Sequence, residues 1–274
     1  MSIKNILVCF NGTDKAKRAV RMGAALARRY DAHLTGAFPH TVPHTMIQME
    51  GYMSQAALDL VHDGLREADQ RCRETFEAIV AEEEQGLRTS FLSEFGFPND
   101  AIARLGRTYD LIVVAQPDED SSVYTDPFPD DVAMKSGRPV LIVPRAFEQF
   151  ELAKGVILAW DGQRAAARAL SEAMDLIEDK HSVTVLHVGR EQDVRQPGRD
   201  IMEHLSRHGL DAALNVQAPG KLKTSDIILN ACAEADAGLL VMGAYEHSRF
   251  SELLLGGVTR DITTKSHIPV LMAH

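Results

Sequence analysis

The sequence contains few cysteines, no long apolar run and no excess of positive charge. Its cysteines, Cys9, Cys72 and Cys232, are odd in number and widely spaced, so they form neither a disulfide framework nor a zinc-binding pattern. No apolar run approaches the roughly 18 residues that a membrane span needs. The net charge of −10 argues against electrostatic binding of nucleic acid. These absences exclude membrane-spanning, disulfide-stabilised and nucleic-acid-wrapping classes of protein.

The beginning of the sequence also shows little that resembles a targeting signal. An apolar segment from Ile6 to Phe10 follows Lys4 directly, and it has neither the length of a signal-peptide core nor a small-residue cleavage site. Together with the free cysteines, this predicts a cytoplasmic protein that has neither a membrane nor a nucleic acid as partner.

What the sequence does contain is an internal repeat. The segment KNILVCFNG, which begins at Lys4, aligns with KGVILAWDG, which begins at Lys154, and the alignment continues without a gap through alanine-rich stretches. Further along, residues 111–114 align with 239–242, and residues 139–142 align with 269–272. Self-similarity over most of a chain indicates that one structural unit occurs twice. We therefore expect two domains, 1–146 and 153–274.

Each copy reads as strands alternating with helices. Short apolar runs predict strands near 4–10, 32–38, 88–94, 111–115 and 139–143 in the first copy, and near 155–160, 182–188, 212–217, 239–243 and 269–273 in the second. Helical spacing of apolar residues predicts a long helix over 54–85 and a shorter counterpart over 198–208. This order is typical of an α/β fold of the Rossmann-like type, with a mainly parallel sheet and helices on both of its faces.

The predicted arrangement of the two copies follows from their edges. The linker at 145–154 is short, so we expect two tandem five-stranded sheets packed together as a pseudo-dimer. Each copy ends in a strand, Pro139 to Val143 or Pro269 to Ala273, which would otherwise be an unpaired edge. We therefore predict that these two strands meet within one chain. Assembly of several chains into a homo-oligomer through other faces stays open.

The last third of the chain contains a glycine pattern that can hold an anion. Gly243 ends an apolar run, and Gly256 and Gly257 follow just before a segment that can begin a helix. Glycine lets backbone N–H groups approach a phosphate closely, and a helix start contributes partial positive charge. The alternative interpretation of this spacing is a glycine-containing turn that only joins a strand to a helix.

With this pattern and the repeat, the sequence resembles the universal stress proteins, as a tandem pair over essentially all 274 residues. ATP-binding members of that family carry G-x2-G-x9-G-S/T after the fourth strand and an aspartate after the first. In the second copy Asp161 matches this aspartate, and the strand end at Val188 matches the place where the family holds adenine. The resemblance implies ATP as the ligand, with Mg²⁺ as a companion ion, and implies these nucleotide-binding residues: Asp161, Val188, Gly243, Glu246, Gly256, Gly257 and Thr259.

The second copy departs from the family pattern at two of these positions. Glu246 replaces the second glycine, and Gly257 replaces the hydroxyl residue, with Thr259 two positions beyond. A carboxylate about 4 Å from a triphosphate repels it by about 1 kcal/mol in water. Mg²⁺, Arg249 or His247 would offset this repulsion. The alternative is that Glu246 faces solvent, so both interpretations stay open.

The first copy departs much further from the pattern. Asn11 replaces the aspartate, and the phosphate loop is replaced by Ala115-Gln116-Pro117 and an acidic stretch that contains no glycine. We therefore expect the first copy to have a degenerate site and to contribute surface only. The carboxylates from Asp118 to Asp131 match no calcium loop, so we expect them to be solvated and predict no metal site.

The resemblance implies a stress-response protein that binds an ATP-type nucleotide and acts through its conformation or through protein partners that the sequence does not identify. Two alternatives remain. The protein is a nucleotide-free interaction module, which the changes at Glu246 and Gly257 favour, or it is a slow ATPase. The ATPase is the least favoured because no catalytic residue is identified, and Asp161 and Glu246 are the only general bases in view. We therefore expect a binding protein rather than an enzyme.

Overall fold

The computed structural model describes residues 3–41, 54–83, 86–146, 154–177, 182–244 and 257–274. By their contacts the residues divide into two compact units, Ile3–Ser136 (the N-terminal unit) and Gly137–His274 (the C-terminal unit). The division falls before the last strand of the first copy rather than at the linker. The domain limits 1–146 and 153–274 therefore stay a prediction of the sequence.

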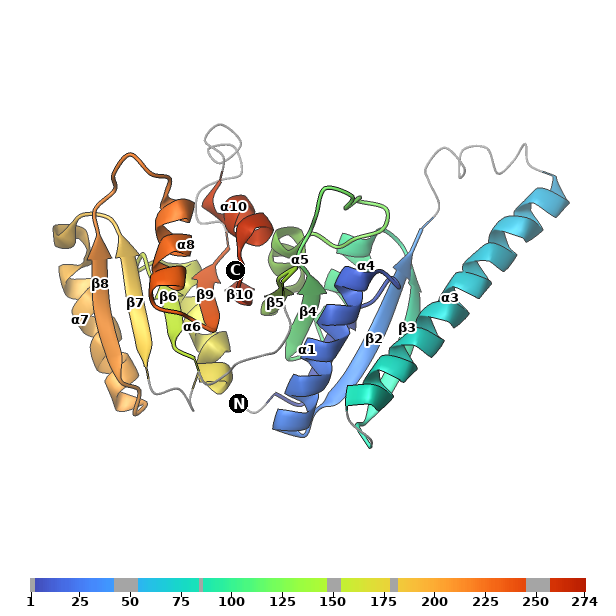
Figure 1. The fold of residues 1–274 in the computed structure, drawn as a ribbon, viewed down its shortest axis with the longest axis horizontal. Coiled ribbons are helices and arrows are strands. Elements are labelled where there is room, and N and C mark those ends of the chain that lie inside the picture. The colour runs from blue at the N-terminus through green and yellow to red at the C-terminus, as the bar shows by residue number, and fades with distance from the viewer. Residues whose placement is uncertain (1–2, 42–53, 84–85, 147–153, 178–181, 245–256) are drawn as a thin grey trace. The chain divides into compact units, whose positions relative to one another are not determined.

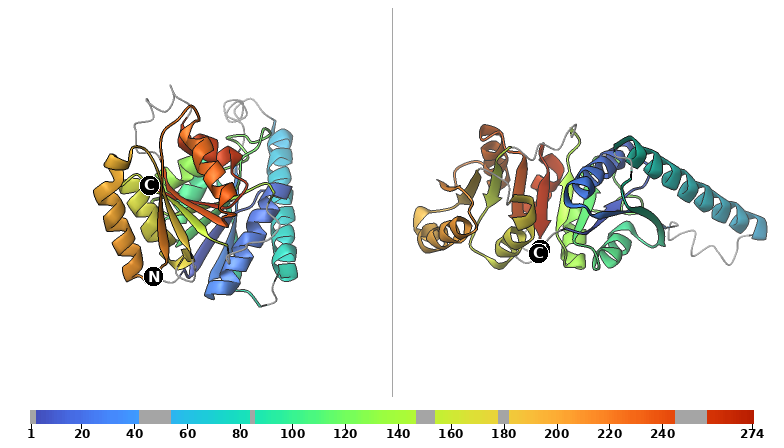
Figure 2. Two further views of the ribbon diagram at one scale, coloured as in Figure 1. Left: turned by 60° about the vertical axis from the view of Figure 1, so that its left-hand side comes forward. Right: turned by 90° about the horizontal axis from the view of Figure 1, so that it is seen from below.

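The N-terminal unit contains a parallel sheet with strand order β3-β2-β1-β4 (Figure 1). Its elements in chain order are β1 Asn5–Cys9, α1 Asp14–Tyr30, β2 His33–His40, α3 Gln55–Glu83, β3 Thr89–Phe95, α4 Pro98–Gly106, β4 Leu111–Ala115 and α5 Pro129–Ser136. Helices α1 and α3 cover one face of this sheet, and α4 and α5 cover the other (Figure 2). The unit is the two-faced α/β layer that the sequence predicts.

Aromatic side chains fill the space between this sheet and its first pair of helices. The ring of Phe76, on α3, lies 6.4 Å from that of Phe10 and 5.5 Å from that of Phe91, measured between centroids. Gly36 on β2 makes this packing feasible, because a Cβ there would lie 2.8 Å from both Phe76 and Phe91. The absence of a side chain at Gly36 therefore lets a helix residue reach the sheet.

The C-terminal unit contains the remaining strands in the order β5-β10-β9-β6-β7-β8. Its elements are β5 Val140–Val143, β6 Val156–Ala159, α6 Arg164–Ile177, β7 Val183–Val188, α7 Glu191–Arg207, β8 Ala212–Gln217, α8 Thr224–Glu234, β9 Leu239–Gly243, α10 Val258–Lys265 and β10 Val270–Ala273. Helices α6 and α7 cover one face of the sheet, and α8 and α10 cover the other (Figure 2).

The pairing of the final strands confirms a prediction made from their sequences. Strand β10 is parallel to β9 on one side and antiparallel to β5 on the other, with Leu271 opposite Leu141. Both strands are buried along their whole length. Because β5 and β10 pair with each other, neither strand is left as an open edge. The cost of an open edge was the physical reason for expecting this pairing.

One predicted boundary is wrong. The helix expected over 198–208 begins seven residues earlier, so that α7 runs from Glu191 to Arg207. The Pro197-Gly198 pair suggested a break. Proline's fixed φ is itself helical, however, so the helix continues through Pro197 at the cost of one hydrogen bond.

No helix among the described residues is both long enough and apolar enough to span a membrane.

Candidate functional site

The residues that the sequence assigns to a nucleotide site lie in the C-terminal unit, where its parallel strands end. Strands β6, β7 and β9 run in the same direction, so Asp161, Val188 and Gly243 follow or close them at one edge of the sheet. Open α/β sheets bind ligands outside the carboxyl ends of their strands. The structure therefore brings these three residues to the edge where the fold class places ligands.

Asp161 starts the turn into α6. Its Oδ1 accepts a hydrogen bond of 3.0 Å from the backbone N–H of Gln163, and the residue is exposed. Aspartate favours such turns because its side chain bonds to the backbone two residues on. The turn holds the carboxylate at the sheet edge, where it is open to solvent and to a ligand.

Gly243, the first glycine of the motif, has a packing role of its own. A Cβ at this position would lie 2.6 Å from the backbone carbon of Ala165 and 2.7 Å from the backbone nitrogen of Ala166. Because these are backbone atoms of α6, they cannot move aside as a side chain would. The close approach of β9 to the first turn of α6 therefore requires glycine here whether or not a ligand binds.

Helix α10 begins at a glycine. Gly257 is its N-cap residue and has no side chain that could accept a hydrogen bond from the first-turn amides. Thr259, in that first turn, is 3% exposed. The N–H groups and the dipole of a helix start can bind an anion. A phosphate-binding role for Gly257 and Thr259 stays a prediction.

The first turn of α10 also contains an acidic residue, Asp261, whose carboxylate is bound by neighbouring side chains. Asp261 accepts a 3.0 Å hydrogen bond from Ser225 Oγ and forms an ion pair of 2.9 Å with Lys265. The hydrogen bond from Lys265 is the main reason that the pKa of Asp261 is lowered, and it outweighs the partial burial that raises it. The carboxylate is therefore ionised at neutral pH and neutralised within the unit.

Two buried polar atoms lie near the end of β6. His187 is 7% exposed and donates from Nδ1 to the backbone oxygen of Trp160 at 2.9 Å, since a carbonyl can only accept. His187 Nε2 and Trp160 Nε1 are both buried, and neither has a hydrogen-bond partner among the described residues. Both side chains lie outside the glycine pattern.

The remaining assigned residues, Glu246 and Gly256, lie outside the described residues. The effect of Glu246 on a bound phosphate therefore stays a prediction, as does the nucleotide-binding role of the whole set.

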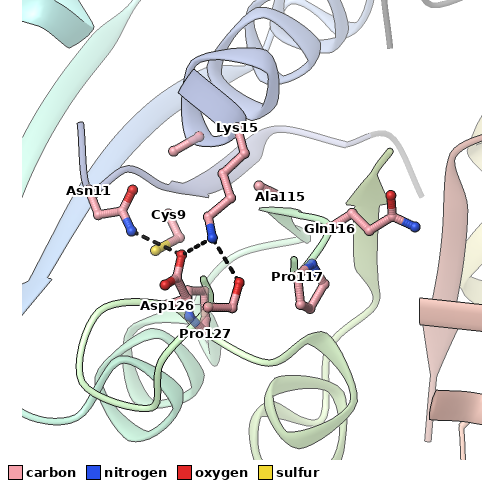
Figure 3. A pocket seen from close by; sticks show the side chains of 10 residues that line it. Cys9, Asn11, Lys15, Ala115, Gln116, Pro117, Asp126 and Pro127 are labelled. Atoms are coloured by element: carbon pink, nitrogen blue, oxygen red, sulfur yellow. Dashed lines mark hydrogen bonds and ion pairs between the residues drawn. The ribbon is translucent and has the colours of Figure 1, made fainter. Parts of the chain in front are cut away.

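In the N-terminal unit, the corresponding edge contains an internal ion-pair cluster (Figure 3). Lys15, in the first turn of α1, contacts Asp118 Oδ1 at 2.8 Å and Asp126 Oδ1 at 2.9 Å, and donates to Ser121 Oγ at 2.7 Å. The Lys15 and Asp126 side chains are each 10% exposed. Burial disfavours the ammonium, but its hydrogen bonds to the two carboxylates prevail and raise the pKa of Lys15. The two carboxylates therefore already pair with the ammonium group that an anionic ligand would need.

Backbone amides of the acidic loop after β4 also donate hydrogen bonds to side chains of the same loop. The amide of Asp118 donates to Ser121 Oγ, and the amide of Ser122 donates to Asp126 Oδ2. Asn11, which replaces the family aspartate, donates to Asp126 Oδ1 at 3.2 Å. A cavity of about 10 Å³, enough for about one water molecule, remains beside Lys15 (Figure 3). These contacts give a physical reason for the degenerate site that the sequence predicts.

A larger cavity of about 560 Å³ opens next to this cluster, at the ends of β1 and β2. It is lined by the network residues and, among others, by Arg18, Phe38 and His40. The sequence analysis missed both Lys15 and this cavity. The only available signal was a lysine in the first turn after Asn11, combined with an acidic loop of matching charge. Among the described residues, no three His, Cys, Asp or Glu side chains are grouped to hold a metal ion.

Comparisons with known proteins agree with this architecture. The model of the universal stress protein family matches residues 2–144 and 221–274. The chain is 21% identical over 294 residues to universal stress protein Slr1230 of Synechocystis, an alignment that covers 98% of this chain and 99% of that protein. It is 25% identical over 144 residues to universal stress protein YxiE of Bacillus subtilis, which covers 43% of this chain and 96% of YxiE.

A solved universal stress protein from Archaeoglobus fulgidus shares the fold, with a TM-score of 0.68 at 15% identity and with 100% of this chain and 99% of that chain covered. The family match covers well over half of the residues and falls in both copies of the repeat. The chain therefore belongs to the universal stress protein family, with two family segments in tandem.

Proposed function

We propose that the C-terminal unit binds an ATP-type nucleotide and that the N-terminal unit does not. The observation that carries this proposal is the start of α10, where the N-cap residue Gly257 has no side chain to compete for the helix start, at the same sheet edge as Asp161. Phosphate groups bind such helix starts through backbone N–H groups. In the equivalent place of the N-terminal unit, α5 has two acidic residues in its first turn, Asp130 and Asp131, whereas α10 has one, Asp261, which pairs with Lys265.

In this proposal the protein responds to stress through its nucleotide-bound conformation or through protein partners, and it works in the cytoplasm. Mg²⁺ accompanies the triphosphate and moderates the charge of Glu246. Hydrolysis is not part of the proposal, because the described residues of this edge include no general base placed beside a nucleophile.

Calorimetric titration with ATP tests the one-site proposal. We expect one nucleotide per chain, and we expect Gly256→Asp to abolish binding because a side chain and a negative charge enter the phosphate path. Gln116→Ala, in the loop of the N-terminal unit, is the control and should leave the affinity unchanged. Equal losses from both substitutions would overturn the assignment to one unit.

Glu246→Gly sharpens the same test. Removing the carboxylate should tighten ATP binding by roughly 1–2 kcal/mol, about 5- to 30-fold, in the absence of Mg²⁺. The gain should shrink at high salt because screening weakens the repulsion. Unchanged or weaker binding would mean that Glu246 points away from the phosphates.

The alternative function is a nucleotide-free interaction module, which the replacements at Glu246 and Gly257 favour. Mass spectrometry of the protein released from a native purification distinguishes the two. A co-purified nucleotide supports the proposal, and its absence combined with no heat of ATP binding supports the interaction module.

A further inference from the structure

The end of α7 carries two histidines that are one helical turn apart. His204 lies inside α7, and His208 is its C-cap residue, whose backbone N–H donates to the backbone oxygen of His204 at 3.3 Å. The helical spacing therefore continues from one residue to the other. Residues four positions apart are neighbours on the same face of a helix. Both histidines are exposed, so two imidazoles lie side by side at the surface.

The two rings lie at the separation that a shared metal ion requires. Their centroids are 4.7 Å apart, and their planes are inclined by 50°. A metal bonded at about 2.0–2.1 Å to one nitrogen of each ring, with about 90–110° between the bonds, holds the centroids about 4.5–5.2 Å apart. Among the described residues, neither imidazole has a hydrogen-bond or ion-pair partner. The ring nitrogens are therefore available as metal ligands.

The charges around this pair favour a cation. The carbonyl end of a helix carries a partial negative charge, and both histidines lie at that end of α7. Asp200 stands one turn before His204 and adds a carboxylate on the same face. Arg207, the nearest cationic side chain along the helix, is paired with Glu203 at 2.9 Å. A positive ion between the imidazoles would therefore meet more negative than positive charge.

Both histidines also line a cavity of about 390 Å³ between α6 and α7, together with Ser171 and Asp200 among others. No three His, Cys, Asp or Glu side chains among the described residues are grouped around one metal position, so Asp200 contributes charge rather than a bond. Two protein ligands leave at least two positions of a four-coordinate ion open. The cavity gives room for water or a small donor molecule at those positions.

We propose that His204 and His208 chelate one divalent transition-metal ion, such as Cu²⁺ or Zn²⁺, at the exposed side of this cavity. Imidazole nitrogen suits these ions, whereas Mg²⁺ prefers oxygen ligands. The site lies on the α6–α7 face, whereas α10, which carries the proposed phosphate site, covers the opposite face of the sheet (Figure 2). It is a second site, which the sequence analysis does not predict and which does not depend on nucleotide binding.

Calorimetric titration of the full chain with Cu²⁺, in a buffer that does not bind metal, tests the proposal. Cu²⁺ is the divalent ion that nitrogen ligands bind most tightly. We expect the tightest site to hold one ion per chain, and electron paramagnetic resonance to show two imidazole nitrogens on it. His204→Asn and His208→Asn should each weaken binding at this site about tenfold or more, because the second ligand on a rigid helix binds at high effective concentration. Excess Mg²⁺ should leave the affinity unchanged.

Two controls separate chelation from binding to any surface histidine. His62→Asn removes an exposed histidine of α3 that has no histidine three or four positions away, and it should leave the affinity unchanged. His208→Asn combined with Ser206→His keeps two exposed histidines on α7 but places them two positions apart, where they do not face each other. This double variant should bind as weakly as His208→Asn alone.

Circular dichroism of each variant checks that α7 stays folded. Equal Cu²⁺ affinity in His208→Asn and the unsubstituted protein would overturn the proposal, as would full affinity in the double variant. Displacement of Cu²⁺ by Mg²⁺ would also overturn it, because the ion would then be held by oxygen atoms. Failure of ATP to bind would leave these expectations unchanged, so the two proposals fail separately.

Discussion

The two units of this chain treat the same sheet edge in opposite ways. In the N-terminal unit, Lys15 is neutralised by Asp118 and Asp126, and the loop amides bond to the loop's own side chains. In the C-terminal unit, the N-cap residue of α10 is Gly257, which has no side chain, and Asp161 lies exposed at the end of β6. The two copies thus share one fold, while the N-terminal copy pairs the polar groups of this edge internally and the C-terminal copy has an exposed carboxylate there.

The comparison also shows that glycine serves two different purposes at this edge. Gly243 is required by the backbone of α6, since a Cβ would meet two backbone atoms within 2.7 Å. At the aligned position the N-terminal unit has Ala115, so its β4 and α1 tolerate a side chain. A motif glycine is therefore not by itself evidence for a bound phosphate.

The largest expected effect comes from opening the ion-pair cluster of the N-terminal unit. Lys15→Met leaves two carboxylates, one of them 10% exposed, without their cation, and should lower the free energy of unfolding by about 3 kcal/mol. Denaturant unfolding monitored by circular dichroism measures this change. Lys17→Met, which breaks the exposed pair with Asp14, is the control and should cost less than about 0.5 kcal/mol.

The same cluster has a predicted pH dependence. Because the folded-state pKa of Lys15 is raised, its stabilising contribution is fully present below the unfolded-state value of about 10.4 and is lost as the pH rises through the folded-state pKa. The difference in stability between the unsubstituted protein and Lys15→Met should therefore be constant near neutral pH and narrow only in strong alkali. A difference that already disappears at pH 7 would contradict the ion-pair explanation.

A smaller effect is expected from the close approach in the C-terminal unit. Gly243→Ala should cost about 2 kcal/mol, because the added Cβ forces β9 away from α6. Thermal unfolding measures the loss. The control is Gly220→Ala, where a Cβ would meet nothing within 4 Å, and it should change stability by less than about 0.5 kcal/mol. If Gly243→Ala and Gly220→Ala were equally stable, β9 could move away from α6 without loss of stability.

The smallest effect concerns the acidic residue of α10. Asp261→Asn removes the ion pair with Lys265, which is 49% exposed and therefore partly screened, so the expected loss at pH 7 is about 0.5 kcal/mol. The folded-state pKa of Asp261 is lowered, so its contribution is present above the unfolded-state value of about 3.9 and is lost as the pH falls through the folded-state pKa. The free energies of unfolding of Asp261→Asn and of the unsubstituted protein should therefore become equal in acid. A constant difference between them down to pH 2 would contradict the ion-pair explanation.

Most of the architecture could be predicted because it depends on local patterns. Apolar runs located the strands to within a few residues, and the repeat correctly implied that each copy has the same order of elements. The pairing of β5 with β10 followed from the cost of leaving two apolar edge strands unpaired. The start of α7 was wrong because a Pro-Gly pair signals a break locally, whereas the structure continues the helix through it.

The candidate site was less predictable because its chemistry joins distant residues. Lys15 and Asp118 are 103 positions apart, and nothing in either segment alone indicates that they share a hydrogen bond. The cavity between α6 and α7 is likewise lined by residues from separate segments, among them Trp160, Ala167 and Ile201. No single-segment pattern describes a cavity.

The sequence by itself determined the class of the fold, the duplication and the family, because strand and helix periodicity and a glycine-containing motif are properties of neighbouring residues. Only the tertiary structure decided which unit neutralises its own edge and why Gly243 must lack a side chain. The physical reason is that ion pairs, close backbone approaches and cavities arise between segments that meet only when the sheet and its helices pack. Their energies depend on burial and distance, which the order of residues along the chain does not specify.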